Sequence, residues 1–188
     1  MIRIWGIINN MKKVLYLFPL VLVFLFSCSE IKNSPMTKVK EDNYPSFNLP
    51  DLKGNYINLK DYSNSFVLIN FWATWCAPCV KEIPSLNNLN EHFKETSNFK
   101  MIAINIGQNK GVIEKFFIDK SLSIDFPVLL DENMELSDWN IQAIPTTFLI
   151  DGSGKIIYKI EGEKEWDSSE FTSFFKTSCI TYSVLEFD

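Results

Sequence analysis

The sequence is poor in the residues that build metal sites and disulfide scaffolds. Its 188 residues include four cysteines and one histidine. Sites made of several histidines are therefore excluded, and two neighbouring cysteines supply only half of a structural zinc site. Four cysteines are also too few for a disulfide scaffold in a domain of this size. We expect neither a metal nor another cofactor.

Basic residues are outnumbered by acidic ones, 18 against 23, which gives a formal net charge of −5. A chain of this charge offers neither the basic footprint that binds nucleic acid nor a basic face for anionic lipid. With 46% hydrophobic residues, the length suits one globular domain plus a leader or tail.

The sequence also lacks an apolar run at its start that could span a bilayer. Lys12 and Lys13 precede the uncharged segment 14–26, which is shorter than the roughly 20 residues that a transmembrane helix needs. A charged start and a short apolar middle are typical of a secretory signal peptide. We predict a signal peptide at residues 1–27, with Met11 rather than Met1 as the true start.

The segment Leu25-Phe26-Ser27-Cys28 resembles the lipobox of bacterial lipoproteins. The resemblance implies that Cys28 is acylated and becomes the first mature residue. An ordinary cleaved signal, or an uncleaved anchor with a chance cysteine, is the alternative. The polar, aperiodic residues after Cys28 predict that 28–43 form the lipidated N-terminus and a flexible tether.

The remaining chain alternates between strand and helix patterns and predicts one domain at 44–178, with a tail at 179–188. A mixed sheet with helices on both faces is expected, with an N-terminal β-hairpin and an inserted αβ unit. Strands are predicted at 66–71, 100–106, 126–130, 144–150 and 155–160, and the hairpin at 47–59. Helices are predicted at 76–94, at 111–121, from a cap at Asp131 through Trp139, and from Asp167 or Ser168 onward.

Two cysteines, Cys76 and Cys79, stand at the start of the helix that follows the first buried strand. The first cysteine then faces unpaired N–H groups and the positive end of the helix dipole, which favour its thiolate. Because residues three apart share a helix face, Cys79 can resolve a mixed disulfide formed by Cys76. A structural disulfide or half of a metal site is the alternative, although so small a loop gains little stability from a disulfide.

The stretch 67–86 contains Asn-Phe-Trp-Ala-Thr-Trp-Cys-Ala-Pro-Cys and Glu-Ile-Pro, and resembles the TlpA/ResA-like branch of the thioredoxin superfamily. The resemblance extends from about residue 44 to about residue 176 and includes Ile144-Pro145-Thr146-Thr147. It implies a thioredoxin-like α/β fold in which Pro145 is cis and lies against the active-site cysteines. It also implies that Trp75, Pro78, Ile144 and Pro145 bind the substrate. A strand-edge proline is the alternative for Pro145.

The resemblance also bears on proton transfer. Thioredoxin itself has a buried aspartate where this chain has Asn70, and an amide cannot accept the proton of the resolving thiol. ResA-like proteins carry instead a glutamate at the position of Glu82, whose pKa burial would raise. A solvent-facing Glu82 without a catalytic role is the alternative.

By resemblance, the expected function is that of a monomeric thiol–disulfide oxidoreductase that is lipid-anchored to a bacterial membrane. It would face the cell envelope outside the cytoplasm, or the periplasm in a Gram-negative cell. A membrane thiol reductant would supply its electrons, and its substrates would be disulfides of exported proteins, including apocytochrome c. The alternatives are an oxidant or isomerase, a peroxidase, and a non-catalytic lipoprotein that binds a partner through the same groove.

Overall fold

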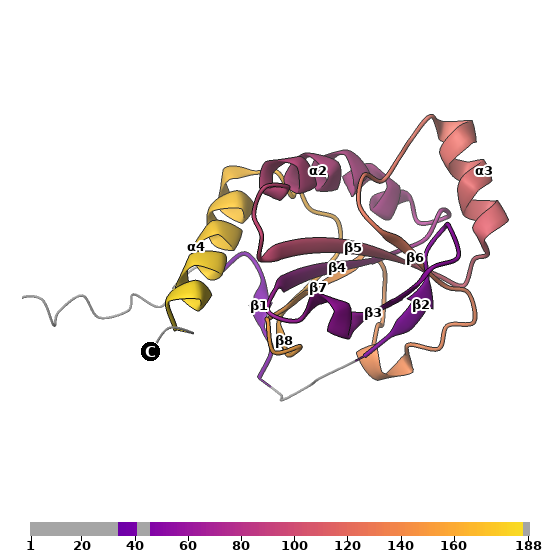
Figure 1. Ribbon diagram of the computed structural model, residues 1–188. Coiled ribbons are helices and arrows are strands. Elements are labelled where there is room, and N and C mark those ends of the chain that lie inside the picture. The colour runs from indigo at the N-terminus through magenta and orange to yellow at the C-terminus, as the bar shows by residue number, and fades with distance from the viewer. Residues whose placement is uncertain (1–33, 41–45, 186–188) are drawn as a thin grey trace, which may run out of the picture. The chain divides into compact units, whose positions relative to one another are not determined.

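The computed structural model describes residues 34–40 and 46–185, with side chains up to residue 178. Its strands form a six-stranded sheet in the order β1-β8-β7-β4-β5-β6 and a separate two-stranded sheet, β2-β3 (Figure 1). The strands are β1 (Thr37–Lys38), β2 (Asn48–Pro50), β3 (Tyr56–Asn58), β4 (Phe66–Trp72), β5 (Phe99–Ile106), β6 (Val128–Asp131), β7 (Thr146–Ile150) and β8 (Ile156–Glu161). The helices are α2 (Ala77–Phe93), α3 (Lys110–Lys120) and α4 (Ser169–Leu185), with the 3-10 helices η2 (Leu59–Tyr62) and η3 (Ser137–Trp139).

Strand β4 lies at the centre of the large sheet, and all its residues are buried. It runs parallel to β5 and antiparallel to β7. A nearly continuous apolar run is what a strand covered on both faces requires. A short loop after its end leads to Cys76 and Cys79 at the start of α2.

The two faces of the sheet are covered differently. Helices α2 and α4 pack on one face, where Leu86, Leu89 and Phe175 are fully buried, and Ile113 of α3 joins the same cluster. The other face is covered by the β2-β3 hairpin together with η2 and η3, through Phe47, Leu49, Leu59 and Trp139. The sequence predicts helices on both faces of the sheet. On this second face, the helices among the described residues are the 3-10 helices η2 and η3.

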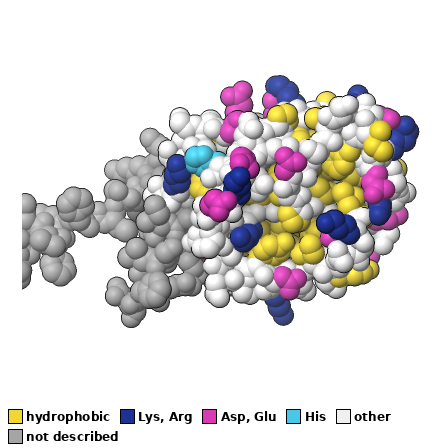
Figure 2. Space-filling model, turned by 45° about the horizontal axis from the view of Figure 1, so that its top comes forward, with side chains coloured by type: hydrophobic (Ala, Val, Ile, Leu, Met, Phe, Trp, Pro, Cys, Tyr) yellow, Lys and Arg dark blue, Asp and Glu magenta, His cyan; other side chains and the backbone are white. Residues whose placement is uncertain are grey.

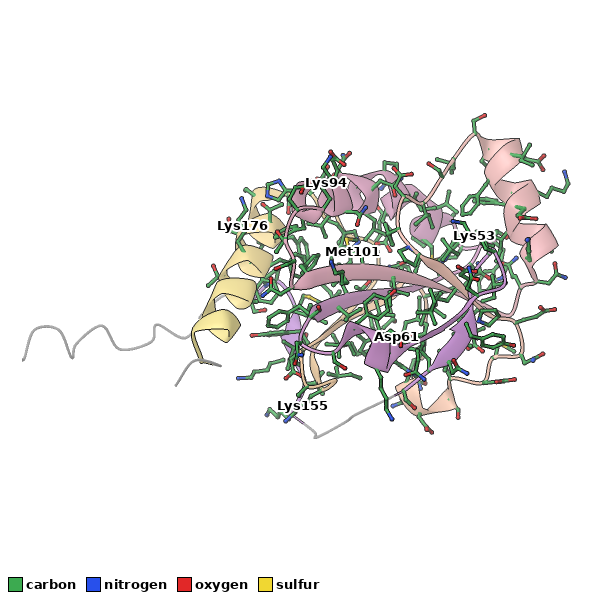
Figure 3. The ribbon with its side chains drawn as sticks, viewed as in Figure 1. Lys53, Asp61, Lys94, Met101, Lys155 and Lys176 are labelled. Atoms are coloured by element: carbon green, nitrogen blue, oxygen red, sulfur yellow. A yellow bond between two sulfur atoms is a disulfide. The ribbon has the colours of Figure 1, made fainter. Side chains whose placement is uncertain are left out.

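Side chains fill the space between the sheet and its covers (Figure 3). Met101 of β5, labelled near the centre of the picture, is 4% exposed. In the part of the chain that the structure describes, no helix is long and apolar enough to cross a membrane.

The prediction of a helix from Asp131 through Trp139 is wrong. Asp131 ends strand β6 and accepts hydrogen bonds from the backbone N–H groups of Glu135 and Leu136, at 2.7 and 3.4 Å. Its carboxylate therefore closes a turn, and only η3 is helical in this segment. An acidic residue followed by a polar stretch is compatible with either a helix cap or a turn.

The predicted tether at 28–43 also differs from the structure. Thr37 and Lys38 pair with Lys159 and Tyr158 and so form an edge strand. Met36 beside them is buried. The predicted signal peptide at 1–27 and the predicted lipidation site, Cys28, lie outside the described residues. At the other end, helix α4 continues to Leu185, past the predicted boundary at 178.

A substitution at Met36 measures how much residues 34–40 contribute to the stability of the fold. Since Met36 is 3% exposed, we expect Met36→Ala to lower the free energy of unfolding by about 2 kcal/mol. Met134, which is 67% exposed, provides the matched control, and Met134→Ala should cost less than about 0.5 kcal/mol. Urea denaturation measures both, and equal stabilities of the two variants would show that residues 34–40 do not contribute to the fold.

Candidate active site

Cys76 and Cys79 lie at the junction of β4 and α2, as predicted. Cys76 is the N-cap of α2, and its Sγ accepts the backbone N–H of Cys79 at 3.3 Å. The two sulfurs are joined in a disulfide. The sulfur of Cys76 therefore occupies the place where an N-cap acceptor satisfies one of the unpaired N–H groups of the helix.

The loop that leads into this cap is held by Gln108. The Gln108 side chain accepts the backbone N–H of Thr74 at 2.8 Å and donates to the Thr74 hydroxyl at 2.7 Å. Buried Asn105 donates to the same Gln108 oxygen at 3.2 Å. Sequence reasoning missed this pair because neither residue belongs to a motif or to a hydrophobic period.

Pro145 lies next to the disulfide. The Ile144–Pro145 peptide bond is cis, as the resemblance implied. Cys76 Sγ lies 3.6 Å from the carbonyl oxygen of Ile144. Pro145 itself is buried, while Ile144 is partly exposed. The backbone at Ile144 is thus placed beside the first sulfur.

The rim around the pair is apolar and open to solvent. Trp75 is 68% exposed, whereas Cys76 is 5% exposed. Ala77 and Pro78, between the two cysteines, are also exposed. On the face seen in Figure 2, apolar side chains reach the surface among interspersed acidic and basic ones, so that this face carries no field of one sign.

Behind the pair, the carboxylate of Glu82 is buried in helix α2, with 1% exposure. It accepts hydrogen bonds from Asn70 Nδ2 at 2.7 Å and from Trp166 Nε1 at 2.9 Å. A third bond comes from the backbone N–H of Lys164 at 3.2 Å. Glu82 is therefore not the solvent-facing residue that was the alternative prediction.

Burial raises the pKa of Glu82 to about 7. Removing a carboxylate from water disfavours its charged form. The hydrogen bonds from Trp166, Asn70 and Lys164 lower the pKa and offset part of this effect, and the nearby charge of Glu163 raises it slightly. Glu82 therefore titrates near neutral pH, where a group can both accept and release a proton.

Asn70 connects this carboxylate to the strand that follows Pro145. Its amide nitrogen donates both to Glu82 and to the Thr147 hydroxyl, the latter at 2.9 Å. Thr147 is fully buried in β7. Asn70 is thus a donor to the carboxylate and cannot itself take a proton from a thiol.

Among the described residues, no group of three or more His, Cys, Asp or Glu could hold a metal ion. The histidine, His92, is exposed near the end of α2. The ionisable or redox-active groups placed together at the site are the two sulfurs and the buried carboxylate of Glu82.

Comparison with known proteins agrees with this arrangement. The family model described as AhpC/TSA matches residues 41–159. The thiol-disulfide oxidoreductase ResA of Bacillus subtilis is 39% identical over 119 residues, which cover 63% of this chain and 65% of that protein. ResA of Bacillus thuringiensis is 37% identical over 127 residues, which cover 67% of this chain and 72% of that protein. The chain belongs to the ResA-type thiol–disulfide oxidoreductases of the AhpC/TSA family.

Solved structures confirm the predicted thioredoxin-like α/β fold of this ResA-type chain. A protein from Chlorobium tepidum, assigned as the thiol:disulfide interchange protein DsbE, superimposes with a TM-score of 0.67 at 28% identity. The match covers 76% of this chain and 99% of that one. On this fold, Cys76 and Cys79 form a cysteine pair at disulfide distance.

The raised pKa of Glu82 predicts how stability depends on pH. Glu82 is protonated below about pH 4.5 in both the folded and the unfolded chain, and between about 4.5 and 7 only the folded chain keeps the proton. The free energy of unfolding should therefore fall as pH rises through this window, by on the order of 3 kcal/mol. Glu82→Gln should remove this fall.

Urea unfolding of the oxidised protein, from about pH 4 to about pH 8, measures this contribution. Glu91→Gln, on the exposed side of the same helix, is the matched control and should keep the wild-type fall. A Glu82→Gln variant with the same pH dependence as the wild type would show that Glu82 does not titrate in this window.

Proposed function

We propose that this protein is a membrane-tethered reductase of disulfides in exported proteins, acting outside the cytoplasm. The observation that carries the proposal is the position of Cys76 Sγ at the start of α2, 3.6 Å from the Ile144 carbonyl. A substrate chain paired with the backbone at Ile144 would bring its disulfide to this sulfur, with Trp75 and Pro78 as apolar contacts.

In the proposed reaction the reduced pair attacks the substrate. The thiolate of Cys76 forms a bond with one substrate sulfur while the substrate disulfide breaks, and the other substrate sulfur leaves and takes a proton. Cys79 then loses its proton and attacks Cys76. This forms the Cys76–Cys79 disulfide and releases the second substrate sulfur, so that two electrons have passed to the substrate.

Glu82 is proposed as the acceptor of the Cys79 proton. It stands three residues after Cys79 and therefore on the same face of α2. Its pKa of about 7 lets it accept the proton and pass it on to solvent. When charged, it also disfavours a thiolate nearby and keeps the thiols less acidic.

The direction of electron flow is proposed from the same surroundings. Strong oxidants stabilise their reduced thiolate, which makes the disulfide easier to reduce. Here Ala77 and Pro78 supply no cation between the cysteines, and the buried carboxylate opposes a thiolate. These features favour a reductant over an oxidant or isomerase.

Tethering and partners are proposed from the sequence and from relatives named for thiol–disulfide exchange. The lipobox at Cys28 supports an acyl anchor. An enzyme that reduces disulfides in an oxidising compartment must be re-reduced by a thiol donor, and we propose a membrane thiol reductant in this role. Apocytochrome c is proposed as one substrate on the strength of the family resemblance alone.

Substrate trapping tests the proposed exchange. In Cys79→Ser the mixed disulfide on Cys76 cannot be resolved, so we expect thiol-sensitive adducts with exported proteins. The double variant Cys76→Ser, Cys79→Ser keeps the other cysteines and should form none of these adducts. Absence of adducts in Cys79→Ser, together with full cellular function of Cys76→Ala, would instead support a non-catalytic binding protein.

A further inference from the structure

The connector between β8 and α4, residues 162–168, contacts both sides of the active site. Its Gly162 donates a backbone hydrogen bond to the carbonyl oxygen of Pro145 at 2.8 Å. Two residues later, the Lys164 N–H reaches Glu82 Oε2, and the Trp166 indole N–H reaches the same oxygen. The connector therefore joins the cis-proline turn to the buried carboxylate.

Trp166 is held firmly in this position. Its side chain is completely buried and packs on Phe171, with ring centroids 4.8 Å apart. Its backbone N–H donates to Ser85 Oγ at 3.2 Å, and Ser85 in turn donates to the Glu82 carbonyl oxygen at 2.9 Å. Both the backbone and the ring of Trp166 are thus anchored to the turn of α2 that carries Glu82.

The donors are distributed unequally over the two carboxylate oxygens. Oε2 receives two N–H groups, from Lys164 and Trp166, whereas Oε1 receives one, from Asn70. A carboxylate oxygen offers about two acceptor positions. Both positions on Oε2 are therefore occupied, and Oε1 retains one.

We propose that Trp166 is a positioning residue for disulfide exchange. Its indole N–H occupies the second acceptor position of Glu82 Oε2, so that the proton of Cys79 is directed to Oε1. In this step the S–H bond of Cys79 breaks and an O–H bond forms on Oε1. The carboxyl group then returns the proton to solvent. The inference rests on the proposed function, since it refines the role given there to Glu82.

The charged groups around Glu82 are exposed or partly buried. They are Lys81 from α2 and Glu163, Lys164 and Glu165 from the connector. Lys81 pairs with Glu163, and the Lys164 ammonium donates to the carbonyl oxygens of Glu161 and Glu163. Among the described residues of the sheet, the uncharged Asn70 and Thr147 reach this network. The buried side-chain donors to the carboxylate are therefore Asn70 and Trp166.

The test is Trp166→Phe in the full-length oxidised protein, with protonation of Glu82 followed by the infrared band of a protonated carboxyl group. Glu82→Gln assigns the band by removing it. Loss of a hydrogen bond to the charged form should raise the midpoint by about one pH unit. Trp139→Phe is the matched control, since the buried Trp139 indole has no hydrogen-bond partner among the described residues; its midpoint should equal that of the wild type.

A wild-type midpoint in Trp166→Phe would overturn the inference. If that variant does not fold, replacement of Trp166 by β-(3-benzothienyl)alanine keeps the ring shape without the N–H and should give the same upward shift; an unmoved midpoint again overturns it. The pH–rate profile of disulfide exchange gives a second readout. The limb of this profile that Glu82→Gln abolishes should move upward in Trp166→Phe by the same amount as the infrared midpoint. Because the infrared midpoint needs no turnover, a Cys79→Ser variant that traps no substrate would overturn the proposed function separately.

Discussion

A carboxylate buried behind the cysteine pair is the constraint on which the arrangement of this site depends. An ionisable group with 1% exposure is tolerated only when donors replace the lost water. The donors to Glu82 come from β4 through Asn70 and from the β8-α4 connector through Lys164 and Trp166. Satisfying one side chain of α2 therefore fixes that helix against the central strand and against a segment far along the chain.

The same contacts join the rear of the site to its front. Asn70 also bonds Thr147, two residues after Pro145, and Gly162 of the connector bonds the Pro145 carbonyl oxygen. The sulfur of Cys76 lies beside the preceding Ile144 carbonyl. The surface proposed to bind a substrate chain and the group proposed to take up the proton are thus joined by one set of hydrogen bonds.

The sequence predicted the parts of this unit that have a local signal. Cys76 and Cys79 are recognisable from their spacing after a buried strand, and the resemblance pointed to Pro145 and Glu82. Trp166 and Gln108 gave no such signal, because their partners lie 84 and 34 residues away. At Asp131 the local signal led to a wrong prediction, because a helix cap and a turn have the same sequence pattern. Strand β1 was not predicted, because two residues are too few to show an alternating pattern. Contacts between side chains far apart in the sequence form only once the sheet has assembled, so the sequence of one segment does not predict them.

The central functional claim is that this pair donates electrons, because neither the residues between the cysteines nor the buried carboxylate favours a thiolate. The reduction potential of the Cys76–Cys79 couple, measured by equilibration with a glutathione or dithiothreitol buffer at neutral pH, tests it most directly. The account predicts a value near that of a reducing thioredoxin, about −270 mV. A value near about −120 mV, typical of a strong oxidant, would contradict it.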